Sequence, residues 1–140
     1  MEPSVSKDYS ATPLSKKLGI KPGARVGVVN EPDGFFDLLE PVPQGVRFYQ
    51  RASRPLDVIV YFSDEIANIT RRVPVFAGYI APDGALWVCY PKKSSDHATD
   101  ASFEAVQRVG LEAGLVDNKS CAIDETWTAL RFVYRIKDRS

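Results

Sequence analysis

The sequence is short of the residues that commonly hold transition metals. It contains two cysteines and one histidine, and no two of these residues have the CxxC spacing of a zinc site. A structural zinc ion needs about four protein ligands, so we predict no metal site built from sulfur and imidazole. Cys89 and Cys121 each lie within an apolar run, where a reduced thiol packs as a small hydrophobic side chain. We therefore expect both cysteines in the core.

The sequence also has no excess of either charge and no long apolar run. Eighteen basic and eighteen acidic residues cancel, which argues against a general attraction to nucleic acid or to an anionic membrane. No apolar run approaches the roughly 20 residues that span a bilayer. Residues 1–13 lack the apolar core of a secretion signal. The sequence thus predicts a cytoplasmic protein with a small-molecule or protein partner, a homo-oligomer being one option, and no nucleic-acid or membrane partner.

One segment, PDGALWVCYPKK at residues 82–93, organises the rest of the chain. The residues from Leu86 to Tyr90 are apolar or aromatic, and the Pro-Asp-Gly before them is typical of a turn. Because both faces of this strand are apolar, we expect it inside a parallel sheet covered by helices. The ligand crevice of such a sheet lies beyond the carboxyl ends of its strands, where Lys92 and Lys93 stand.

The chain is long enough for one domain, which we place at residues 9–140 after a loose stretch at residues 1–8. Apolar patterns and turn residues predict the other elements. The expected strands are residues 25–30, 46–49, 56–62, 120–123 and 128–136, and the expected helices begin at residues 12, 35, 64 and 101. The last two strands form an antiparallel hairpin around residues 124–126.

Two of these helices have recognisable ends. Ser63 is predicted to cap the helix after residues 56–62, with Asp64 and Glu65 in its first turn and Pro74 bending or breaking it. Asp100 is predicted to cap the following helix, which Gly114 ends in a left-handed conformation. Its inward residues are expected to be Phe103, Val106 and Ala113.

This order of elements resembles the sheet of class I methyltransferases that use S-adenosylmethionine (SAM). LDVIVYFSD corresponds to their motif-IV strand, PDGALWV to a later buried strand, and CAIDETWTALRFVYR to their closing hairpin. The resemblance implies an α/β fold with three layers, Rossmann-like, in which a mostly parallel sheet ends in an antiparallel hairpin. In those enzymes a glycine-rich run after the first strand and an acidic residue after the second hold SAM. Here VNEPDG and YQR stand in those places, so SAM is disfavoured and no cofactor is predicted.

Three further motifs resemble an uncharacterised bacterial family, catalogued as domain of unknown function 3052. They are YSATPLSKKLGIKPGARV, DGALWVCYPKK and GLVDNKSCAIDETWTALRF, in that order along residues 9–135. The resemblance implies no known activity.

The candidate ligand-binding residues stand at predicted strand ends and in one polar cluster. Lys92 and Lys93 suit a phosphate or carboxylate, with Ser94 beside them, although a solvated strand end explains the same residues. The candidates at the neighbouring strand ends are Asn30 and Ser63, and the polar cluster is Asp117, Asn118 and Lys119. A turn leading into a strand is the favoured explanation of that cluster.

Other polar residues are weaker candidates. Asp124 and Glu125 form an acidic pair, but a hairpin connection explains them as well, and neighbouring carboxylates on a strand point to opposite faces. His97 lies in a polar loop and is expected to be exposed to solvent.

Three classes of function are consistent with these residues. The leading hypothesis is a methyltransferase-like domain that does not methylate and binds a small anionic ligand or a protein partner in a regulatory or accessory role. The alternatives are a small transferase-type enzyme acting on an anionic substrate and a self-associating interaction module. The sequence leaves open whether the chain is an enzyme, and the missing glycine run leans against it.

Overall fold

The fold of this chain is seen in a computed structural model, which describes residues 12–50 and 55–139. The predicted loose stretch at residues 1–8 lies outside the described residues. The strands are β1 (Arg25–Val29), β2 (Arg47–Tyr49), β3 (Leu56–Phe62), β4 (Ile80–Pro91), β5 (Leu115–Ala122) and β6 (Trp127–Tyr134). The helices are α2 (Leu14–Lys17), α3 (Phe35–Leu39), α4 (Ile66–Ala77), α5 (Phe103–Glu112) and the short 3-10 helix η2 (Ile136–Asp138).

The six strands form one mixed sheet in the order β2-β1-β3-β4-β6-β5. Strands β2, β1, β3 and β4 are parallel, while β6 runs antiparallel to both β4 and β5. The predicted α/β class, the mostly parallel sheet and the closing antiparallel hairpin are confirmed. As expected from its apolar residues, β3 is central and β2 lies at an edge.

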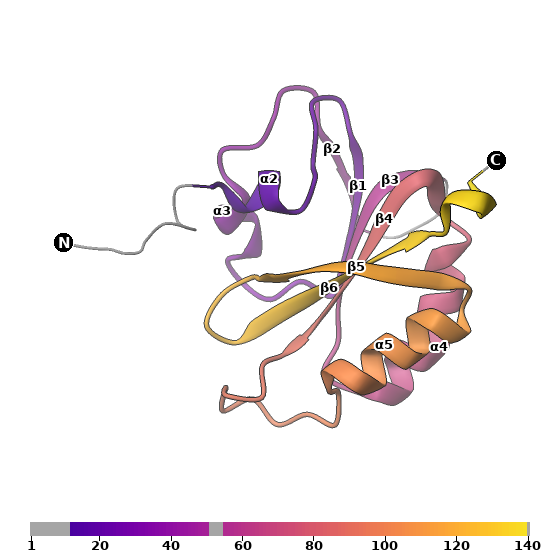
Figure 1. The fold of residues 1–140 in the computed structure, drawn as a ribbon. Helices are drawn as coiled ribbons and strands as arrows, with labels where there is room; N and C mark the ends of the chain where they lie inside the picture. Colours follow the sequence, from indigo (N-terminus) through magenta and orange to yellow (C-terminus); the bar gives the residue numbers. More distant parts are fainter. Residues whose placement is uncertain (1–11, 51–54, 140) are drawn as a thin grey trace.

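Helices cover the two faces of the sheet unequally (Figure 1). The longer helices α4 and α5 lie together on one face, and the short helices α2 and α3 lie on the other. Each face has its own hydrophobic core, one built around Ile69, Val106 and Phe132, the other around Leu18, Phe35 and Trp87. The sheet and the helices on its two faces therefore form three layers, as predicted.

Strand β4 has the buried position expected of the organising segment. Residues 84–91 are all buried, and the indole Nε1 of the fully buried Trp87 donates to the carbonyl oxygen of Leu18 at 2.9 Å. The predicted turn at residues 82–84 is wrong, because these residues belong to β4 and bulge out of its pairing with β3. The register jumps from Leu56 opposite Ile80 to Val58 opposite Ala85.

The predicted helix ends need correction. Helix α4 starts at Ile66, after Asp64 and Glu65, and it continues through Pro74 to Ala77. Pro74 is exposed and lies in the last turn, where a lost hydrogen bond disturbs few residues.

Helix α5 also differs from its prediction at its start. Ser102, not Asp100, caps it by accepting a hydrogen bond from the amide of Ala105 at 3.2 Å. Val106 is fully buried and Ala113 packs against the core, but Phe103 is 42% exposed. Gly114 follows the helix with φ of +91°, as predicted.

Candidate functional site

The carboxyl ends of β1, β3 and β4 meet at one edge of the sheet. Asn30 follows β1 in a left-handed conformation, with φ of 62°, and is exposed. Ser63 follows β3, and its backbone amide donates to the carbonyl oxygen of Cys89 in β4 at 3.0 Å. Lys92 follows β4, two residues beyond Tyr90. Parallel pairing therefore brings Asn30, Ser63 and Lys92 to the same edge.

The side chain of Ser63 serves its own chain segment. Its hydroxyl accepts from the backbone amide of Glu65 at 3.2 Å and lies 3.3 Å from the Glu65 carbonyl oxygen. The prediction that Ser63 caps α4 is wrong. The first amide of the helix, that of Ile66, donates instead to a carboxylate oxygen of Asp100 at 2.8 Å. A residue 34 positions later in the chain supplies this cap.

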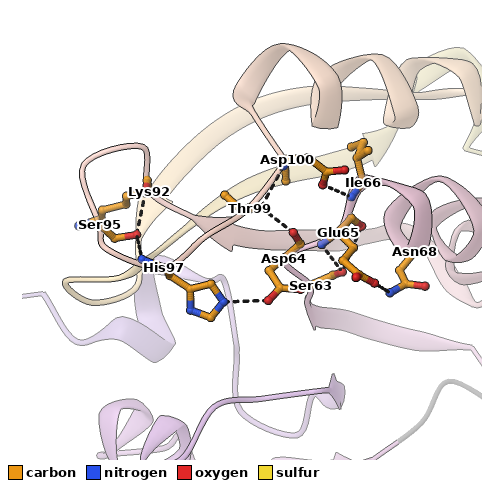
Figure 2. A network of polar contacts seen from close by, with 11 residues as sticks. Ser63, Asp64, Glu65, Ile66, Asn68, Lys92, Ser95, His97, Thr99 and Asp100 are labelled. Atoms are coloured by element: carbon orange, nitrogen blue, oxygen red, sulfur yellow. Dashed lines mark hydrogen bonds and ion pairs between the residues drawn. The ribbon is translucent and has the colours of Figure 1, made fainter.

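Figure 2 shows how the loop of residues 92–102 is attached to the start of α4. His97 Nε2 lies 2.8 Å from a carboxylate oxygen of Asp64, and the Thr99 hydroxyl donates to the Asp64 carbonyl oxygen at 2.6 Å. Within the loop, the Ser95 hydroxyl donates to the Lys92 carbonyl oxygen at 2.8 Å. Together with the Asp100 cap, these contacts fix the loop against the neighbouring helix.

His97 is exposed, as predicted, but it is not alone. Its side chain is 38% exposed and that of Asp64 is 45% exposed. The imidazole also meets the ring of Trp127 edge to face, with centroids 5.3 Å apart. Sequence reasoning missed this pair because Asp64 precedes His97 by 33 residues. The only available signal was that both follow a central strand.

A groove of about 840 Å³ runs along this loop. Lys92, Lys93 and Ser94 line it, and so do several carboxylates. Among the described residues, neither lysine side chain forms an ion pair. The remaining lining includes Tyr90, Asp96, Asp100, Phe103, Glu104 and Thr128. The arrangement can bind an anionic group beside the lysines and a hydroxyl or cationic group beside the carboxylates.

Tyr90 stays a neutral phenol in this groove. It is 8% exposed, and burial, followed by the negative charge of Glu104, raises the pKa of its hydroxyl. A phenol that keeps its proton at neutral pH can donate a hydrogen bond to a ligand.

Aromatic side chains cluster beside the carboxyl ends of β1 and β3. Phe35 and Phe62 are each 1% exposed and pack edge to face with centroids 5.0 Å apart. Phe62 in turn contacts the ring of Trp127 at 5.2 Å, and Phe35 contacts Phe36 at 5.9 Å. Phe35 and Phe62 belong to the core on the face of α2 and α3, and Trp127 packs against it.

The segment after β1 contains a single glycine, Gly34, which has a φ of +85° and no atom within 4 Å of where a Cβ would lie. The glycine within β1, Gly27, faces the neighbouring strand, since a Cβ there would lie 2.7 Å from Leu56 Cδ1. It is a packing residue. At the end of β2, Tyr49 and Gln50 stand where a carboxylate would be needed to hold a ribose, as the sequence indicated.

Asp117, Asn118 and Lys119 are not brought to this edge. They lie within β5, so the prediction of a turn at these residues is wrong, and Asn118 is an extra residue in the pairing with β6. Lys119 pairs with Arg131 of β6. Arg131 lies four residues further along β6 than Trp127, which pairs with Pro91 at the end of β4. Asp117 accepts hydrogen bonds from Gln107 of α5. Ligand binding by this cluster together with Lys92 stays an untested prediction.

The acidic pair in the hairpin connection has a structural role at its first member. One carboxylate oxygen of Asp124 accepts from the amides of Thr126 and Trp127, both at 2.8 Å. Glu125 is exposed. Across residues 12–50 and 55–139, no group of histidine, cysteine, aspartate and glutamate is arranged to hold a metal ion, and no helix is long and apolar enough to cross a membrane.

No protein-family model and no curated protein matches the chain, so membership of the uncharacterised family stays a prediction. Solved structures do match. A SAM-dependent methyltransferase from Aquifex aeolicus has a TM-score of 0.65 at 14% sequence identity, over 85% of this chain and 86% of that one. The chain has a methyltransferase-like fold.

Two further matches have the same fold at similar distance. Magnesium protoporphyrin IX methyltransferase from Synechocystis PCC 6803, with bound SAH, has a TM-score of 0.61 at 10% identity, over 91% of this chain and 81% of that one. A mitomycin 7-O-methyltransferase has a TM-score of 0.64 at 10% identity over 81% of this chain, which spans only 49% of that one. Identities this low establish the methyltransferase-like fold and leave the activity to be argued from the site.

Proposed function

We propose that this chain is a methyltransferase-like domain that does not transfer methyl groups and instead binds a small molecule with an anionic group. The observation that carries the proposal is the contact between Phe35 and Phe62, both buried, beside the carboxyl ends of β1 and β3. SAM in such a fold would need this space and a backbone that approaches it closely. Two phenylalanine rings and a loop with Pro32 do not fit that group.

The groove along residues 92–102 is the proposed ligand site. Lys92 and Lys93 have no ion-pair partner among the described residues, so their charges are available to an oxyanion. Asp96 and Glu104 line the same groove. A ligand that also carries hydroxyl or amino groups would satisfy both the lysines and the carboxylates.

The first test is calorimetric titration of the purified chain with SAM. We expect no binding in the micromolar range. Micromolar binding accompanied by methyl transfer to an acceptor would overturn the proposal.

The second test locates anion binding with inorganic phosphate as the probe, followed by amide resonances in NMR. We expect concentration-dependent shifts at residues 92–104, and Lys92→Ala should weaken the affinity there by about tenfold. Lys137→Ala, an exposed lysine in η2, is the control and should change nothing. If Lys92→Ala and the unmodified chain showed equal shifts, the proposed site would be wrong.

A further inference from the structure

A second cavity lies at the other ends of the strands, near the amino ends of β3 and β4. Its volume is about 320 Å³, at the lower end of the range for ligand sites. The segment between α2 and β1 forms one wall, and the bulge of β4 forms another. The lining residues are Leu18, Gly19, Lys21, Pro22, Gly23, Ala24, Asp57, Val58, Asp83, Gly84, Ala85 and Arg131.

Arg131 supplies an unneutralised charge to this cavity. Arg131 is partly buried, and its Nη1 donates a hydrogen bond to the amide oxygen of Asn118 at 3.2 Å. Burial, followed by the charge of Arg139, lowers the pKa of Arg131. No carboxylate pairs with it among the described residues.

The residue opposite Arg131 adds to the positive charge. Lys119 pairs with Arg131 across the hairpin, so both side chains lie on the same face of the sheet. Like charges directly opposite each other destabilise a sheet. A lysine on the edge strand β5 is explained by protection of that edge, but Arg131 lies on the interior strand β6 and faces the cavity.

The acidic residues of the cavity do not balance these charges. Asp57 accepts a hydrogen bond from the Arg25 amide at 2.8 Å and lies 3.7 Å from the Arg25 Nε, so its charge is already compensated. Asp83 is the other carboxylate in the lining, and it is exposed. Lys21 lines the cavity without an ion-pair partner in the described part of the chain.

We propose that this cavity binds a small oxyanion, the phosphate or carboxylate group of a small molecule, between Arg131 and Lys21. The planar guanidinium offers two parallel N–H donors to such a group, and the ammonium of Lys21 adds a point charge. This site is separate from the groove along residues 92–102, because it lies at the other ends of the same strands. It does not depend on the proposed function.

The test is again an NMR titration, in which the amide resonances around this cavity are followed. Inorganic phosphate is the probe in one titration and citrate in a parallel one. Phosphate should shift the amides of residues 19–24, 83–85 and 131. Arg131→Gln, which removes the charge and keeps an amide donor, should weaken this binding by about tenfold or more. Citrate binding at the same amides would identify a carboxylate site, and phosphate binding alone would identify a phosphate site.

A second variant, which should strengthen binding, keeps the proposal testable if Arg131→Gln does not fold. Asp83→Asn removes the remaining uncompensated carboxylate from an exposed position and should tighten phosphate binding by a few-fold. Lys93→Gln, in the other groove, should leave these amides unaffected. The proposal is overturned if these amides do not move in either titration, or if Asp83→Asn weakens binding.

Discussion

At the scale of single residues, the loop of residues 92–102 depends on a few side chains that reach a different element. Asp100 accepts a hydrogen bond from the first amide of α4. The carboxylate of Asp64 contacts His97, and its carbonyl oxygen accepts from the Thr99 hydroxyl. The His97–Asp64 pair is exposed, and ion pairs at such positions contribute between about 0 and 1 kcal/mol. The cap by Asp100 is the stronger link, because it satisfies a helix amide that has no partner within the helix.

Replacing Asp100 by alanine should therefore destabilise the chain by about 1 kcal/mol, the usual cost of a lost helix cap. Urea denaturation followed by circular dichroism measures the change. Asp100→Asn keeps an acceptor oxygen and should cost less. Ser63→Ala is the matched control, because the Ser63 hydroxyl bonds to Glu65 outside the helix. A larger loss in Ser63→Ala than in Asp100→Ala would show that Ser63 is the cap after all.

At the scale of elements, α5 approaches β6 closely enough to exclude a side chain. A Cβ added at Gly110 would lie 2.0 Å from a ring carbon of Phe132, whose ring is fully buried. The missing side chain lets the helix backbone rest on the ring. Gly110 thus sets the distance between the helix and the sheet, which in turn places the start of α5 beside the groove.

Gly110→Ala should destabilise the chain by roughly 1–3 kcal/mol, the range for overpacking a tight core, although alanine is the better helix former. Thermal and urea unfolding would measure the loss. Gly78→Ala is a suitable comparison: its Cβ would come no closer than 3.4 Å to the Val75 carbonyl oxygen. An unchanged or raised melting temperature for Gly110→Ala would mean that α5 can shift without cost.

At the scale of the whole molecule, one sheet is shared by two cores, and each core contains a buried group that ionises at high pH. Cys89 belongs to the core under α2 and α3, and Tyr61 to the core under α4 and α5. Burial is the largest cause that raises the pKa of each, for Cys89 well above its ordinary value. The folded chain therefore holds protons that the unfolded chain releases.

Stability should fall as pH rises above about 8.5, where an unfolded thiol begins to ionise. A raised pKa in the folded state gives stability that is present below the unfolded pKa and is lost as the pH climbs towards the folded value. The slope is about 1.4 kcal/mol per pH unit for one such group. Urea midpoints at pH 7.5, 8.5 and 9.5, under reducing conditions, measure it.

Cys89→Ala is the control for this pH dependence. It should lower stability at every pH through the cavity that it leaves, and it should flatten the decline between pH 8.5 and 9.5. Midpoints of the unmodified chain that do not change over this interval would mean that Cys89 ionises as easily in the folded chain as in the unfolded one.

Continuous apolar runs and turn residues allowed much of the fold to be predicted. Residues 56–62 and 86–90 have apolar side chains on both faces, which only a strand buried between two layers of helices accommodates. The predictions at helix starts failed at Ser63 and Asp100 for one reason. Both are good capping residues by type, but the residue that caps a helix is decided by which side chain the fold brings within reach of its amides.

The sequence by itself determined the central strands, most of the apolar residues that fill the cores and that Lys92 and Lys93 stand at a strand end, because these features depend on neighbours along the chain. The tertiary structure decided that Phe35 meets Phe62, that His97 meets Asp64, and that Arg131 pairs with Lys119 across the hairpin while lining a cavity. The partners in these contacts lie 12 to 33 residues apart, and they meet only because of the order and register in which the strands pair.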